Sequence, residues 1–188
     1  MPRGYAGDSV CESCMALPPP FSRLYSAYIY QPPVSALISS YKYHGKLVYG
    51  KVLSLKLAAT LETAYGDNHW PHLLVPVPLH AKRIRQRGFN QALEIARWLS
   101  AELDLPFSYQ VVNRSKDTAQ QAGLSAAARR KNIRGAFRIA KPEQVSGKRL
   151  AIVEDVVTTS ITVTELARVL MKAGASEIHV WSLARTCL

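Results

Sequence analysis

The sequence has 188 residues, 48% of them hydrophobic and 20% charged, a composition ordinary for a soluble protein with one domain and a sizeable core. Its net charge of +11 is concentrated in residues 81–149, which hold 15 Lys and Arg against 5 Asp and Glu; this favours a polyanionic partner over a solvated basic face that binds nothing specific. No apolar run approaches the roughly 20 residues that span a membrane, and the N-terminus has no apolar signal core, so we expect a cytoplasmic protein without a membrane span.

The first 24 residues are predicted to be an appendage to one larger domain, residues 25–188. They contain the C-x2-C pair Cys11 and Cys14 and then three prolines that form a rigid linker. Tetrahedral Zn²⁺ needs four ligands, so the pair is half of a zinc site. The remaining ligands belong to a missing upstream segment or to a second chain, or else the pair is vestigial. We expect no complete zinc site within this chain.

Two helices are predicted next. Pro32 and Pro33 open the first, VSALISSYKY, and the second runs from Leu47 to Tyr65 with leucines on one stripe. Tyrosines crowd residues 25–43, with Lys42 and Lys46 nearby. Such tyrosines stack on nucleic-acid bases or pack inside the protein, and we favour packing.

A basic segment follows the next predicted strand, Leu73 to Leu79. We expect it to be a loop that leads through Gly88 into a helix. Four cations on a loop at the carboxyl end of a strand suit a clamp for pyrophosphate or another polyanion. They are Lys82, Arg83, Arg85 and Arg87.

Residues 113–135 are polar, basic and poor in large apolar side chains, which is typical of a functional loop that closes over a site. Strands are predicted on either side, at 109–112 and 137–139. We expect Arg114 and Lys116 to assist the pyrophosphate clamp, and we assign Gln121, Arg129 and Asn132 to the flexible loop.

A strand, a loop and a helix are predicted from Leu150 to Gly174. The strand ends at Glu154 and Asp155, whose carboxylates suit ribose hydroxyls or a magnesium-bound sugar. The loop that follows meets a helix N-terminus, where free N–H groups and a positive dipole end favour a phosphate. The predicted phosphate-binding residues are Val157, Thr158, Thr159, Ser160, Ile161 and Thr162.

The next strand, Glu177 to Leu183, completes a right-handed βαβ unit. His179 alternates with Ile178 and Val180 along it. We expect this histidine to be a satisfied core or surface residue without a catalytic role.

The phrase EDVVTTSIT resembles the signature that binds phosphoribosyl pyrophosphate (PRPP) in type I phosphoribosyltransferases, with Ser160 where that family usually has Gly. The wider pattern resembles the ComF family and its GntX branch. The shared phrases are CESCMALPPP, VPVPL, RIRQRGFNQ, RSKDTAQQAGL, VEDVVTTSIT and VWSLARTCL.

This resemblance implies an α/β fold of the type I phosphoribosyltransferase (Rossmann-like) class, a mostly parallel sheet with flanking helices and a small zinc-ribbon-like appendage. It also implies a role in DNA uptake during competence or in the use of external DNA. PRPP or another phosphorylated ribose, with Mg²⁺, is the expected ligand, and single-stranded DNA or DNA-uptake proteins are the expected partners. The alternative is an active phosphoribosyltransferase of nucleotide metabolism with an unknown acceptor.

Overall fold

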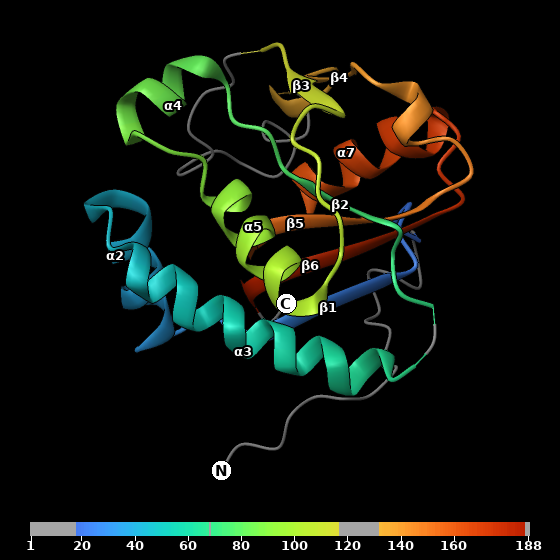
Figure 1. Cartoon of the computed structure of the whole chain (residues 1–188). Coiled ribbons are helices and arrows are strands. Elements are labelled where there is room, and N and C mark those ends of the chain that lie inside the picture. Colours follow the sequence, from blue (N-terminus) through green and yellow to red (C-terminus); the bar gives the residue numbers. More distant parts are fainter. Residues whose placement is uncertain (1–17, 68, 117–131, 187–188) are drawn as a thin grey trace.

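A four-stranded parallel sheet forms the centre of the computed structural model, which describes residues 18–67, 69–116 and 132–186 (Figure 1). The strand order is β1-β6-β5-β2, and every neighbouring pair is parallel. All four carboxyl ends therefore lie at one edge of the sheet, the edge at which ligands of such folds bind. The strands are β1 (Arg23–Ile29), β2 (Leu73–Pro76), β5 (Arg149–Val157) and β6 (Glu177–Arg185).

Helices cover both faces of this sheet, which gives three layers (Figure 1). One face packs against α2 (Val34–His44), α3 (Leu47–Tyr65) and α5 (Gln91–Leu103). The other face packs against α7 (Ile161–Lys172) and a hairpin formed by β3 (Val112–Arg114) and β4 (Phe137–Ile139). Two short helices complete the described elements, α4 (Ala81–Arg87) between β2 and α5, and η1 (Pro142–Gln144).

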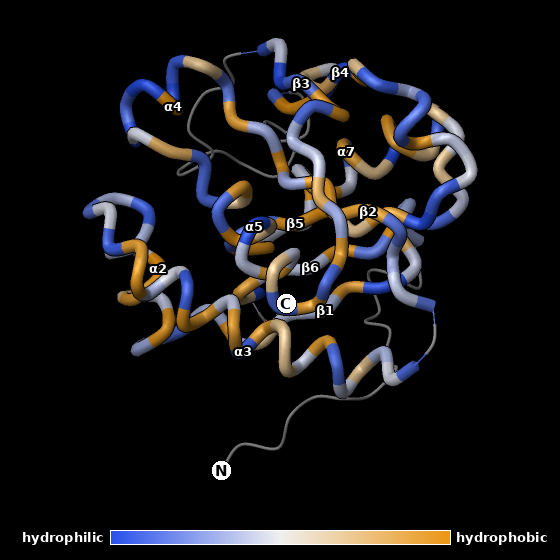
Figure 2. Tube along the Cα trace, in the orientation of Figure 1, coloured by the Kyte–Doolittle hydropathy of each residue, from blue (hydrophilic) through white to orange (hydrophobic). Residues whose placement is uncertain are grey.

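Alternation along the buried strands explains the two-sided core. In β5, Leu150 and Ile152 contact the α7 layer, while Ala151 and Val153 contact the α3 and α5 layer. Successive strand residues point to opposite faces, so an unbroken apolar run serves a sheet that is covered on both sides. Figure 2 shows the same run as a continuous hydrophobic segment at the centre of the molecule.

The structure confirms the predicted fold class and most of the predicted elements. The helix over Leu47–Tyr65 and the parallel β5-α7-β6 unit are confirmed. His179, expected in the core or at the surface, is fully buried. No described helix is both long and apolar enough to cross a membrane.

Three sequence predictions were wrong. Residues 81–87, predicted to be a loop, form α4, which begins after His80 and ends at Gly88 in the left-handed region. Strand β5 continues to Val157 because its last residues still pair with β6, so Glu154 and Asp155 lie within the strand. The strand predicted at 109–112 begins at Val112 instead, and β1 was not predicted at all.

Candidate functional site

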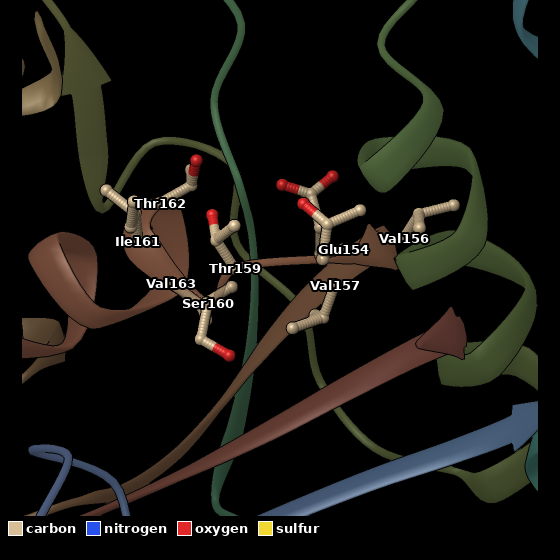
Figure 3. A pocket seen from close by; sticks show the side chains of 9 residues that line it. Glu154, Val156, Val157, Thr159, Ser160, Ile161, Thr162 and Val163 are labelled. Carbon is tan, nitrogen blue, oxygen red and sulfur yellow. The ribbon is translucent and has the colours of Figure 1, made fainter. Parts of the chain in front are cut away.

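A pocket opens where β5 passes into α7 (Figure 3). Its lining combines one carboxylate, from Glu154, with the hydroxyl-bearing loop that was predicted to bind phosphate. The lining residues are Glu154, Val156, Val157, Thr158, Thr159, Ser160, Ile161, Thr162 and Val163. The structure thus brings one predicted acid and all six predicted phosphate-loop residues around a single opening.

Ser160 shapes this loop through an unusual backbone conformation. Its φ is 55° and its ψ is 1°, in the left-handed region that L-residues other than Asn and Asp seldom occupy. It is the N-cap of α7, its side chain forms no capping hydrogen bond, and its carbonyl accepts from the N–H of Thr164 at 2.8 Å. The left-handed turn accounts for the glycine of the related signature, because glycine adopts this conformation without a Cβ penalty.

Neighbouring positions on β5 separate the two predicted acids. Glu154 lines the pocket, whereas Asp155 is only 4% exposed and its Oδ2 lies 2.8 Å from the Nζ of Lys42. Asp155 also accepts the N–H of Val156 at 2.6 Å. The acids therefore do not present two equivalent carboxylates to one ligand. Sequence reasoning missed Lys42 as the partner of this acid.

The charges of this cluster depend on one another. Burial and the negative charge of Asp155 raise the pKa of Glu154 to about 8, although Lys42 opposes the rise. Burial by itself lowers the pKa of Lys42, but Asp155 more than offsets this, and the net pKa of Lys42 is raised. Near neutral pH Lys42 is therefore charged against Asp155, and Glu154 is largely protonated and able to donate a hydrogen bond to a ligand oxygen.

The predicted polyanion clamp lies on a helix, and its four cations differ in their surroundings. Arg87 donates to the Oε1 of Gln91 at 3.1 Å, and its guanidinium stands 5.2 Å from the ring centre of Tyr43. Tyr43 follows Lys42 at the end of α2, and Lys42 contacts Asp155. The contact between Arg87 and Tyr43 therefore places the end of α4 at the same carboxyl edge of the sheet as the acids. Arg87 thus anchors α4, while Lys82, Arg83 and Arg85 of the same helix are exposed or half-buried.

Among the described residues, Arg114, Lys116 and Asn132 do not line the pocket. The guanidinium of Arg114 lies over the ring of Phe137 at 5.6 Å, and Lys116 donates to the carbonyl of Arg134 at 2.8 Å. Asn132 is helical. The other predicted residues, Gln121, Arg129, Cys11 and Cys14, lie outside the described residues. Within the described ranges, no group of three or more His, Cys, Asp or Glu side chains is placed to hold a metal ion.

Comparisons with known proteins relate the chain to one family. The model of the phosphoribosyl transferase domain family matches residues 89–186. The DNA utilization protein YhgH of Escherichia coli K12 is 38% identical over 178 residues, which are 94% of this chain and 78% of that protein. Competence protein F of Haemophilus influenzae is 35% identical over 93% of this chain and 78% of its own length. Among solved structures, the PRPP amidotransferase of B. subtilis in complex with ADP and GMP matches 71% of this chain and 26% of its own, with a TM-score of 0.48 and 21% identity.

Proposed function

This chain belongs to the ComF family of phosphoribosyl transferase domain proteins, and we propose that it binds PRPP or another phosphorylated ribose between β5 and α7 and acts in DNA uptake or the use of external DNA. The relatives named for DNA utilization and competence match over most of their length, which supports the second part of this proposal. The first part rests on the geometry of the β5-α7 loop.

The observation that carries ligand binding is the convergence of three features on one opening. The N-terminus of the 12-residue helix α7 faces the loop, Ser160 turns the backbone there in the left-handed region, and the hydroxyl-bearing residues Thr158 and Thr159 line the same pocket. A helix N-terminus binds the phosphate through backbone N–H groups, and hydroxyl donors add to them. This loop receives the 5-phosphate of the ribose.

Glu154 is the pocket group that meets the sugar. At neutral pH its protonated carboxyl donates to one ribose hydroxyl and accepts from another. Asp155 acts through Lys42 and shapes the charge of the cluster from behind the strand.

Magnesium fits this site as a companion of the ligand. Mg²⁺ is commonly held by one or two carboxylates together with substrate phosphates, and the pocket offers one such group, Glu154, which would hold the ion only after releasing its proton. When bound, the ion neutralises charge on the pyrophosphate group. Zinc at Cys11 and Cys14 stays a prediction, because both cysteines lie outside the described residues.

A nucleic-acid contact is proposed for α4. The helix carries four cations and no acidic residue within Ala81–Arg87, and phosphate contacts of this kind require no particular base sequence. Lys82, Arg83 and Arg85 are the residues proposed to meet DNA phosphates, while Arg87 holds the helix in place.

Calorimetric titration with PRPP and Mg²⁺ tests the ligand proposal. Thr159→Glu puts a negative charge at the phosphate position, and we expect it to weaken binding by more than about a hundredfold through charge repulsion. Thr63→Glu, at an exposed position of α3, is the matched control and keeps wild-type affinity. Equal affinity of the two variants, both folded by circular dichroism, contradicts the proposal.

A further inference from the structure

Large apolar side chains are exposed at the end of α2 and along the first half of α3. Tyr43, Val48 and Val52 are 62%, 60% and 58% exposed, and Leu47, Leu55 and Tyr49 are 46%, 40% and 37% exposed. They make up six of the nine large hydrophobic residues that are exposed in the described part of the chain. Five of the six lie on α3, and this concentration distinguishes them from the scattered apolar residues that any protein surface carries.

Helix α3 is apolar on two opposite faces. Its inner face contributes Leu53, Leu57 and Leu61 to the core. Its outer face carries an exposed row, which we call the α3 seam, made of Val48, Val52, Leu55 and Ala59. The seam spans about 60° of the helix circumference and about 17 Å of its length. Figure 2 shows hydrophobic segments along the first half of α3, at the periphery of the molecule.

The spacing of the seam matches a helix-packing surface. Its intervals of four, three and four residues are those of alternating d and a positions in a coiled-coil heptad, which accept the side chains of a facing helix. A helix that is apolar all round is normally covered on every side. Nucleic-acid bases stack on aromatic rings, whereas the seam itself is aliphatic, so a helix suits it better than DNA.

The charges beside the seam specify the partner. Lys51 and Lys56 flank it about 70° to either side, at the g and e positions of the heptad. Both are exposed, and the sequence has no Asp or Glu between Glu12 and Glu62. A helix that docks here meets two flanking positive charges and no negative charge within the seam.

A second copy of the chain meets this surface poorly. The symmetric antiparallel register that pairs Val48 with Ala59 also pairs Val52 with Leu55, and so uses the whole seam. The same register brings the two copies of Lys51 together on one side of the interface and the two copies of Lys56 together on the other. Two like-charge contacts then oppose the apolar contact, an arrangement that disfavours self-pairing.

We propose that the α3 seam is a docking site for an amphipathic helix of another protein, one with apolar residues at its a and d positions and Asp or Glu at the flanking positions. This inference is independent of ligand binding between β5 and α7. The partner contributes the acidic residues that this chain lacks, and each of them pairs with Lys51 or Lys56.

The charge rule is testable with the protein itself. A Lys51→Glu, Lys56→Glu double variant sets Glu against Glu when it pairs with itself, but Glu against Lys at both contacts when it pairs with the wild-type chain. We expect each protein alone to be monomeric in sedimentation velocity, and the equimolar mixture to associate about tenfold more tightly than either alone. Adding Val52→Ser to both chains removes the association, because it breaks the centre of the seam.

Four results overturn the proposal. The first is a mixture that associates no more tightly than the separate chains, and the second is an association that survives Val52→Ser. The third is self-association of the wild-type chain through the seam, which would make a second copy the occupant. The fourth is binding of the wild-type chain to vesicles of phosphatidylglycerol and phosphatidylethanolamine that Val52→Ser abolishes, which would make a lipid surface the occupant.

Discussion

Replacing Lys42 by Met tests the link between α2 and the acid on β5. The Nζ of Lys42 lies 2.8 Å from the Oδ2 of Asp155, and the two side chains are only 18% and 6% exposed. Removing one partner of a buried ion pair costs about 3–5 kcal/mol, because the other charge is left in a medium of low polarity. The N–H of Val156 still donates to Asp155, so we expect the free energy of unfolding to fall by about 3 kcal/mol, near the lower end of that range.

Urea denaturation at pH 7 measures this loss. Lys56→Met is the matched control, since Lys56 is an exposed lysine on the neighbouring helix, and we expect it to change the free energy of unfolding by less than about 0.5 kcal/mol. Adding Asp155→Asn to Lys42→Met removes the unpaired charge and recovers most of the loss. If the Lys42 and Lys56 variants are equally stable, the ion pair does not hold α2 to the sheet and the reasoning fails.

Three further predictions follow from the strained residue, the buried histidine and the basic helix. Ser160→Gly leaves the free energy of unfolding unchanged or raises it by up to about 1 kcal/mol, because glycine adopts a φ of 55° without strain. Ser160→Val lowers it by about 1–2 kcal/mol, because a β-branched residue tolerates this φ least. Urea denaturation of both variants measures whether each one is more or less stable than the wild type. Burial lowers the pKa of His179 in the folded protein, so below about pH 6.5 the unfolded chain binds a proton more readily than the folded one. The free energy of unfolding is therefore highest above that pH and decreases as the pH falls. If a His179→Gln variant loses as much unfolding free energy between pH 7 and pH 5 as the wild type, His179 is not the origin of the loss. Neutralising Arg83 and Arg85 together reduces the slope of log binding constant against log salt concentration, measured with single-stranded DNA, by about 1.4, since each phosphate contact contributes about 0.7. Glu154→Gln leaves this slope unchanged. An equal change of slope in both variants means that the pocket and α4 form one site.

The β5-α7-β6 unit was predictable from sequence because its signals are local. The apolar run from Leu150 to Val153 specifies a strand that is buried on both faces, and the spacing of Leu166, Val169 and Leu170 specifies a helix. The hydroxyl-rich residues between them then have one place to lie, at the carboxyl end of the strand. The candidate pocket was identified through these short-range constraints.

The surroundings of the acids were not predictable, because they depend on contacts between distant parts of the chain. Lys42 and Asp155 are more than a hundred residues apart, and no periodicity relates them. The separation of Glu154 from Asp155 needed one further fact, that β5 continues past both acids. Alternation along a strand then turns the two side chains away from each other, although their carboxyl groups still interact.

Two missed elements did carry local signals. Residues 81–87 contain Ala, Lys, Arg and Gln, all good helix formers, and Gly88 supplies a left-handed C-cap. Their positive charge also suits a phosphate-binding loop, and the prediction chose the loop over the helix. Strand β1, RLYSAYI, contains the aromatic and β-branched residues typical of strands, but its tyrosines were read only as packing or base-stacking groups.

The most direct test of the account is a crystal structure of this chain grown with PRPP and Mg²⁺. We predict electron density for the 5-phosphate against the N-terminus of α7, within hydrogen-bonding distance of the backbone of residues 158–162, and a ribose hydroxyl at the carboxyl of Glu154. Density for PRPP only at another surface, or an empty loop at PRPP concentrations that saturate the protein in solution, contradicts the central claim.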